Sequence, residues 1–599
     1  MAAAVRRQML GTVLAATSGG YGLAASRVLA QSAAAPPPAD PPSACGTRPG
    51  QPVDRAVGRR ITAITVAPAA PDRLPGGMRA PLHVTTHPET IRSRLLFAVG
   101  QPVDTARVAE SLRQLQRLPY LLDARITAAC DDAGGAALTV ATRDAWSIRP
   151  EFSVRGGQRA SVGLAETNLF GTGRAARLYL RSDQGQLGVG AAYTDPTLFG
   201  GHAVGAVRRD AYRDGRGWGA MLRTWDNGVF APWGAGVAVQ QSSRVTARAS
   251  AYSARGDTVR RATALALVSH RLALTDRGAT FLQLGVEGER TALAAGPQLP
   301  IVGPSSVRRT FAGVDVGFAR RTAQYVTARW LLPAGSEPLR LGLTRPELPL
   351  GLQTDALVSV GRDFAAHGAA THVDLWAGRV VPLGASRDGA PRALVSVDVW
   401  ASGYHPLGMG AGEWSGGTVR ATVGAVAPAA RGLWSARVSA EHLADPDPDV
   451  RSLALLDPVQ RAVPVSGRLA ESALTGSLER SRHLFGATRN YVLDAALFGA
   501  GAVRWEGAAP QAGDAPRAAS SGRGSAAGLA GAERLYVGSV GAGLRLTPTH
   551  FGPATIRLDV GIPVVHSRAL SGAPFFGVSI TPTFGAGRQR DGRGVLGGL

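Results

Sequence analysis

The sequence predicts a membrane all-β protein, an antiparallel transmembrane β-barrel that follows one small α/β domain. Three observations predict it: 77 of the 599 residues are Gly, apolar residues alternate with polar ones over most of the chain, and the last such stretch, 575–584, closes on an aromatic residue. A large apolar face in so Gly-rich a chain is solvated only if lipid lies on one side. The alternate apolar residues of the closing strand are Phe576, Val578, Ile580, Pro582 and Phe584.

The alternation begins near Glu151 and has a period of two, as a β-strand requires. It is clear in residues 176–181, 282–287, 395–400 and 434–439. Charged residues on one face and Val or Leu on the other indicate a wet lumen and an oily exterior. The alternative is a soluble β-sandwich or propeller, in which the apolar face would point inward. After the N-terminus the sequence has no apolar run of the length that a spanning helix needs.

The chain carries a net charge of +22, and all of its basic side chains other than His are Arg, because it contains no Lys. Excess positive charge can pair with anionic head groups at a membrane surface. We therefore expect the lipids of an outer membrane, lipopolysaccharide included, as partners. Nucleic acid is the rival explanation, but no DNA- or RNA-binding motif or basic helix occurs, and we expect no nucleic-acid partner.

Both ends of the sequence are expected to lie outside the folded domains. Residues 1–30 have the pattern of a signal peptide, with Arg6-Arg7, a weakly apolar core and a small-residue cleavage site at 28–30. The Arg pair resembles a twin-arginine signal, but a barrel should cross the inner membrane unfolded, which favours the general secretory route. Residues 31–57 are predicted to be a disordered Ala/Pro linker, and residues 585–599 a disordered Gly/Arg-rich tail.

A compact α/β pattern occupies residues 58–148. A strand is expected at 60–67, and Thr86-His87-Pro88-Glu89 forms a capping box for a helix that ends at Gly100. Asp104 should cap a second helix, which Pro119 stops. Residues 120–129 and 136–142 then read as a β-hairpin. The predicted order is strand, helix, helix, strand, strand.

Cys45 and Cys130 are the only cysteines, and they bracket this small domain. Export would place them in a compartment that permits disulfides. A disulfide between them and a pair of unpaired buried thiols are both open at this point.

The order of elements, together with segment 95–104, resembles a POTRA domain. Four further segments resemble the barrel of the outer-membrane assembly-factor superfamily, the BamA and TamA type of bacterial surface antigen: 166–173, 193–200, 541–546 and 556–563. The resemblance implies a barrel of about sixteen strands over residues 149–584 in the outer membrane of a Gram-negative cell. It also implies a periplasmic place for the POTRA domain, residues 58–148.

Three sets of site residues follow. Arg557 and Asp559 stand opposite the apolar face of their strand, so lipid cannot solvate them and the lumen should hold them. By resemblance, Arg461 is a candidate for the lock of a loop folded into the lumen, although an ordinary solvated loop would also explain it. The alternate residues Phe576, Val578, Ile580 and Phe584 resemble the closing-strand signal that assembly machinery recognises.

The function implied by the resemblance is insertion or translocation of outer-membrane proteins through a seam between the first and last barrel strands. Unfolded client proteins would be the partners, an exposed strand near 120–129 would hand them over, and accessory proteins would bind the POTRA domain. A two-partner secretion pore and a passive transport or structural barrel are the alternatives. We expect no enzyme, cofactor or metal site: His83 and His87 have a metal-ligand spacing but fall at a helix start, and no catalytic constellation occurs.

Overall fold

The computed structural model describes most of the two predicted folded regions. The described residues are 45–71, 83–155, 159–183, 186–212, 215–224, 228–245, 258–294, 306–327, 347–385, 391–407, 414–429, 432–444, 470–485, 491–506, 533–548, 554–566 and 574–582. The predicted signal peptide, part of the predicted linker and the predicted C-terminal tail lie outside these residues, as do Arg461 and Phe584.

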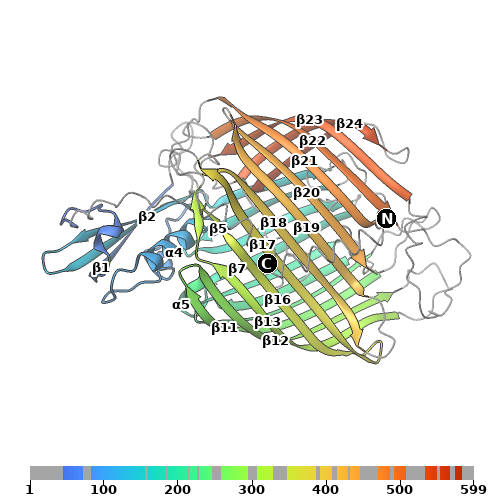
Figure 1. Ribbon diagram of the computed structural model, residues 1–599, viewed down its shortest axis with the longest axis horizontal. Coiled ribbons are helices and arrows are strands. Elements are labelled where there is room, and N and C mark those ends of the chain that lie inside the picture. The colour runs from blue at the N-terminus through green and yellow to red at the C-terminus, as the bar shows by residue number, and fades with distance from the viewer. Residues whose placement is uncertain are drawn as a thin grey trace, which may run out of the picture.

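The small domain (residues 45–71 and 83–144) contains a three-stranded sheet in the order β1-β3-β2, with β1 parallel and β2 antiparallel to β3. Figure 1 shows it in blue at one end of the molecule. The chain passes through the elements in the order strand, helix, helix, strand, strand. They are η1 (Val53–Ala56), β1 (Arg60–Ala69), α3 (Pro88–Arg92), α4 (Thr105–Gln116), β2 (Leu121–Cys130) and β3 (Gly135–Asp144).

Helix α4 begins where the sequence places its cap. The Asp104 side chain accepts hydrogen bonds from the backbone N–H groups of Ala106 and Arg107, as an N-cap residue should. Its apolar residues Val108 and Leu115 are buried in the core of the small domain. The core forms because the apolar stripe of α4 packs on the apolar face of the sheet.

Helix α3 differs from the expectation. Its N-cap is His87, which makes no side-chain cap bond, and the helix ends at Arg92 instead of Gly100. The capping-box prediction is wrong because Thr86 turns its backbone N–H and its hydroxyl to the Asp144 carboxylate, at 2.7 and 2.8 Å. The chain leaves the helix after Arg92, which directs Arg94 toward backbone carbonyls of the barrel.

The second region is a single antiparallel sheet in which each strand pairs with the next along the chain. Its strands are β4 (Ile148–Arg155), β5 (Arg159–Leu169), β6 (Arg174–Asp183), β7 (Gln186–Thr197), β8 (Ala203–Tyr212), β9 (Gly215–Thr224), β10 (Trp233–Val245), β11 (Thr258–Thr275), β12 (Gly278–Ala294), β13 (Ser306–Thr322), β16 (Gly351–Asp363), β17 (Gly368–Ala385), β18 (Pro391–Leu407), β19 (Ser415–Ala429), β20 (Gly432–Ala444), β21 (Ala470–Phe485), β22 (Tyr491–Glu506), β23 (Glu533–Pro548), β24 (Ala554–His566) and β25 (Phe575–Pro582). The strand order is circular, since β25 pairs with β4.

Within the described residues the sheet has twenty strands, so the expected sixteen is wrong. The expectation allotted about 27 residues to each strand and its connection. Many of the actual connections are tight turns, such as residues 170–173, 276–277 and 364–367. Because these connections are shorter than the expectation assumed, the same length of chain forms more strands.

One end of the barrel lies against the small domain, and we call it the domain end; the opposite end is the loop end (Figure 1). Most connections at the domain end are short. An exception is 323–350, which carries a ribbon of β14 (Tyr325–Thr327) and β15 (Glu347–Pro349). The longer connections 445–469 and 507–532 join strands at the loop end. Outer-membrane barrels have this asymmetry, with short periplasmic turns and longer external loops.

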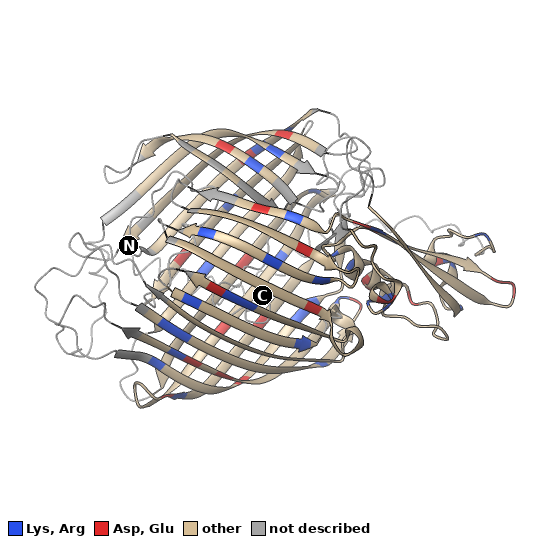
Figure 2. Ribbon diagram, turned by 180° about the vertical axis from the view of Figure 1, so that it is seen from behind, with Lys and Arg blue, Asp and Glu red and all other residues tan. Residues whose placement is uncertain are grey.

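The barrel strands expose apolar side chains and bury polar ones. On β13, Val314 and Val316 are exposed whereas Asp315 between them is fully buried, and β12 and β24 follow the same rule. Figure 2 shows charged residues of both signs along the strands. In a soluble sandwich or propeller the apolar side chains would be buried and the polar ones exposed, which is the reverse, so those alternatives are wrong. The exposed apolar belt includes Leu178, Leu180, Val189, Val237, Leu284, Val286, Val360, Val438, Leu478, Leu497, Val560 and Ile562.

The helices of the structure are short. Among the residues that the structure describes, none of them has the length and apolar character that a membrane-spanning helix requires.

Candidate functional site

The pairing between the first and last barrel strands, which we call the seam, is much shorter than its neighbours. Within the described residues, β25 and β4 pair only at Val578–Val154 and Ser579–Ser153. In contrast, β4 is paired with β5 over its whole length, from Ile148 to Arg155, and β25 with β24 likewise. Since hydrogen bonds between strands hold a barrel together sideways, the seam is the weakest line in the wall.

A network of four charged side chains lies on the inner face of β21, β23 and β24, and we call it the wall network. Arg545 contacts both Asp559 and Glu479, the latter at 2.9 Å, and Arg557 reaches Glu479 at 2.7 Å. Asp559 is only 1% exposed and Arg545 only 5%. Arg557 and Asp559 are the two residues expected in the lumen, and here they belong to a larger network that the sequence pattern did not delimit.

Gly543 makes this network possible. A Cβ atom at this position would collide with the Asp559 carboxylate, the Leu558 carbonyl and the Arg545 guanidinium. Because only Gly lacks that atom, the strand can lie directly under the Arg545–Asp559 ion pair.

A second polar group, the clasp (Glu289, Arg309, Tyr404 and Ser415), lies near the loop end. The Tyr404 hydroxyl donates to Glu289 at 3.0 Å, and Arg309 donates to Glu289 at 3.1 Å and to Ser415 at 2.7 Å. The Arg309 guanidinium also lies over the Tyr404 ring, 3.9 Å from its centre. The sequence pattern did not reveal these residues because the pairs lie 95 or more positions apart, except Arg309–Glu289.

The clasp joins strands that are not neighbours. Glu289 is on β12 and Tyr404 on β18, with β13, β16 and β17 between them in the sheet. The pairing of β13 with β16 ends at Phe311–Asp363, whereas β13 extends to Ser306. Arg309 lies beyond the end of this pairing, and its side chain reaches Glu289, Tyr404 and Ser415. The result is a buried polar bridge just inside the loop end.

Polar contacts fix the small domain to the barrel. Asp144 is fully buried and accepts from Thr86 and His83, the latter at 3.0 Å. The Asn168 side chain, near the end of β5, donates to the Thr86 hydroxyl at 3.0 Å and accepts from the Gly173 N–H of the β5–β6 turn at 2.7 Å. The sequence pattern placed Asn168 in a turn and His83 before a helix, but it did not bring them together.

Arg94 forms a second junction between the two regions. Its guanidinium donates to the carbonyls of Gly201 and Pro196 near the β7–β8 turn, which includes α5 (Leu198–Gly201). Burial lowers the pKa of Arg94 from its usual value. Burial also raises the pKa of the adjacent Tyr120 to about 12. Both side chains are almost fully buried, so water is excluded from this junction.

Helix α4 makes the third junction. The Arg113 guanidinium lies 4.3 Å from the centre of the Tyr325 ring on β14, and Arg107 lies 5.7 Å from that of Phe230. Phe230 ends the short helix η3 (Gly228–Phe230) before β10. The small domain is thus held by several connections of the barrel, from the β5–β6 turn to the β14–β15 ribbon. Together these connections make up a large part of the domain end.

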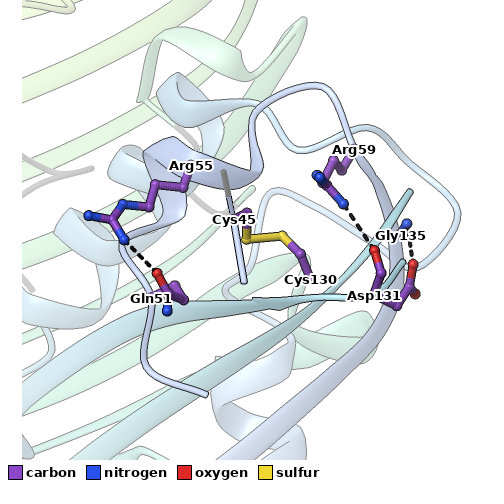
Figure 3. The surroundings of a disulfide bond; sticks show 7 residues. All are labelled: Cys45, Gln51, Arg55, Arg59, Cys130, Asp131 and Gly135. Carbon is purple, nitrogen blue, oxygen red and sulfur yellow. Dashed lines mark hydrogen bonds between the residues drawn. A yellow bond between two sulfur atoms is a disulfide. The ribbon is translucent and has the colours of Figure 1, made fainter. Parts of the chain in front are cut away.

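Cys45 and Cys130 form a disulfide in the structure, with a Cα–Cα distance of 5.6 Å (Figure 3). The bond holds the segment 46–51 against the edge of β2: Gln51 and Ala128 exchange backbone hydrogen bonds, and Cys130 donates to the Gly46 carbonyl. The edge of β2 was expected to be exposed for client strands. That expectation is wrong for residues 128–130, because this segment already uses their hydrogen-bonding groups.

The remaining candidates are placed only in part. Phe576 is exposed on the outer surface of β25, and Val578 is half-buried. Ile580 lies in β25, but its side chain is outside the described part of the structure, as are Phe584 and Arg461.

Several solved structures are similar to this chain at low identity. No protein-family model and no curated protein matches the chain. CdiB from Escherichia coli has 12% identity and a TM-score of 0.40, over 88% of this chain and 76% of its own. CdiB from Acinetobacter baumannii has 12% identity and a TM-score of 0.36, over 88% and 74%. BamA from Haemophilus ducreyi lacking POTRA domains 1-3 has 12% identity and a TM-score of 0.32, over 88% and 85%. Such scores do not assign a family.

Proposed function

We propose that the protein is an outer-membrane β-barrel of the assembly-factor superfamily, which assists the insertion or translocation of outer-membrane proteins. The small domain is its periplasmic POTRA domain. Lipids of the outer membrane surround the apolar belt, and unfolded client proteins are the partners. Accessory periplasmic proteins would bind the free surfaces of the small domain.

The observation that carries the proposal is the short seam within an apolar outer wall. A barrel that only encloses a pore gains stability from complete pairing of all its strands. Here, among the described residues, the seam side of β4 is paired only at Ser153 and Val154, and the adjoining residues 150–152 have no partner on β25. An extended client strand can pair with such an edge by β-augmentation and leave sideways into lipid.

The proposal is tested in proteoliposomes with an unfolded outer-membrane barrel protein as client. We expect the protein to accelerate folding of the client. The variant Ser153→Cys/Ser579→Cys carries cysteines at a facing pair of the seam, and its oxidised form should lose most of the acceleration.

The matched control is Ser153→Cys/Ser161→Cys, which links β4 to β5 instead and should retain activity. Both variants are compared in the oxidised state, because a reductant would also open Cys45–Cys130. Full activity with a locked seam would contradict the proposal.

A further inference from the structure

Continued toward the domain end, the register of the seam aligns a proline of β4 with a proline of β25. The two observed pairs, Val578–Val154 and Ser579–Ser153, define an antiparallel register. If that register continues toward the domain end, Phe152 faces Ile580, Glu151 faces Thr581, and Pro150 faces Pro582. The seam stops before this point.

The orientation of both prolines follows from their other neighbours. Pro150 faces Leu164 in the intact β4–β5 ladder, and Pro582 faces Ala554 in the β24–β25 ladder. In an antiparallel ladder, the backbone groups of successive residues point alternately to one neighbouring strand and to the other. A proline fits such a ladder only where no N–H is needed toward its partner. Both proline nitrogens therefore point toward the seam.

We infer that the Pro150–Pro582 pair is a built-in stop, which keeps the domain-side end of the seam unpaired. A facing pair at this position normally exchanges two N–H···O bonds, and here neither strand has a donor. The seam cannot gain hydrogen bonds there by closing. Opening the barrel wall thus begins at the domain end.

The position of the stop suits the entry of a polypeptide strand. β4 follows the small domain directly, and the chain that leads into it is held there: Ala145, just before β4, donates to the Tyr120 carbonyl, and Arg149 donates to the carbonyl of Pro119. The unpaired edge of β4 that begins at Pro150 therefore lies close to the small domain. This part of the inference rests on the proposed function and assigns the entry point of a client strand to that end of the seam.

Disulfide trapping tests the stop without any client. Two variants place cysteines at facing positions of one register: Glu151→Cys/Thr581→Cys next to the prolines, and Ser153→Cys/Ser579→Cys within the paired part. The native cysteines do not interfere, because they are bonded to each other. Under a mild oxidant, the second pair should form its bond at least roughly tenfold faster, as expected when two hydrogen bonds are missing from the first.

Pro150→Val/Pro582→Val restores both donors. Added to the Glu151→Cys/Thr581→Cys variant, it should raise the rate of disulfide formation to that of Ser153→Cys/Ser579→Cys. Pro428→Val on β19, far from the seam, should leave the rate of the Glu151→Cys/Thr581→Cys pair unchanged. Equal rates for the two cysteine pairs in the presence of both prolines would overturn the stop. A different outcome separates the two proposals. If the Glu151→Cys/Thr581→Cys pair forms its disulfide slowly but locking the seam does not affect client folding, the stop is retained and the proposed function is rejected.

Discussion

Arg545 shows how a single side chain connects strands on the inner face of the barrel. It is nearly fully buried and pairs with two carboxylates from different strands, Glu479 on β21 and Asp559 on β24. Asp559 is more deeply buried than Arg557 and contacts it only at 3.9 Å. Removing Arg545 therefore leaves a buried carboxylate without its main counter-charge.

We predict that Arg545→Ala destabilises the barrel by about 3–5 kcal/mol, the usual result of breaking one side of a buried ion pair. Arg557→Ala is the matched control and should have a smaller effect, because Arg557 is more exposed and Asp559 keeps Arg545. Urea unfolding in detergent, followed by the mobility of unboiled samples in gels, measures both. Equal losses of stability would refute this assignment.

Tyr120 provides a prediction on pH at the same scale. Its pKa is about 12 in the folded protein, against 10.0 for an ordinary exposed tyrosine, so the unfolded chain ionises first. The stability of the small domain should be intact below pH 10 and fall between pH 10 and 12. At about 1.4 kcal/mol per pKa unit, the loss is at most roughly 3 kcal/mol.

Pulse proteolysis of the full chain between pH 9 and 12 measures this loss. The variant Tyr120→Phe has no group to ionise and should show a shallower dependence. If both proteins respond alike to pH, burial of the Tyr120 hydroxyl has no part in alkaline unfolding.

At the scale of elements, the β5–β6 turn and the start of α3 are one joint. Asn168 connects the Thr86 hydroxyl to the backbone of its own turn, and His87 donates its N–H to the Gly171 carbonyl. Thr86 and Asn168 are almost fully buried. Groups that are buried and fully hydrogen-bonded allow few orientations, so this joint fixes the direction of the small domain.

Asn168→Ala should loosen the joint, since it leaves buried partners without hydrogen bonds at a cost of about 1–3 kcal/mol. Spin labels at the exposed positions Thr62 and Arg277 should then report a broader distribution of distances between domain and barrel. Thr172→Ala is the control, because that hydroxyl bonds only within its own turn. An unchanged distribution in Asn168→Ala would mean that other contacts suffice.

On the scale of the whole molecule, the barrel has apolar side chains outside and charges inside, and it is bridged near its loop end. The clasp connects β12 with β18 across three intervening strands. This bridge narrows the lumen at one level, while the small domain covers part of the opposite end. On this basis we propose a gated barrel, and not a passive open pore.

Tyr404→Ala should therefore increase single-channel conductance in planar bilayers, because it removes the ring that lies between Phe311, His372 and Arg309. Tyr404→Phe keeps the ring and loses one hydrogen bond to a charged group, worth about 1.5–3 kcal/mol, so its conductance should stay near that of the native protein. Large steady pores in the native protein would contradict gating and favour passive transport.

Local patterns were sufficient for much of the fold. The period of two predicted strands from β4 to β25, Asp104 predicted the start of α4, and the residues around Asn168 predicted a turn. Each of these depends on neighbours in the chain, which is why the sequence reveals them. The length of α3 was not predictable, because Thr86 and Arg94 have partners 58 and more than one hundred residues away.

The sequence by itself determined that one face of the strands is apolar and the other polar, and that Pro150 and Pro582 lack donors. Only the tertiary structure decided that the described sheet has twenty strands, that Arg545, Glu479 and Asp559 meet, and that the register of the seam aligns the two prolines. The physical reason is that alternation depends on the backbone of a single strand. Register and ion pairs depend instead on which distant strands the closing of the sheet brings together.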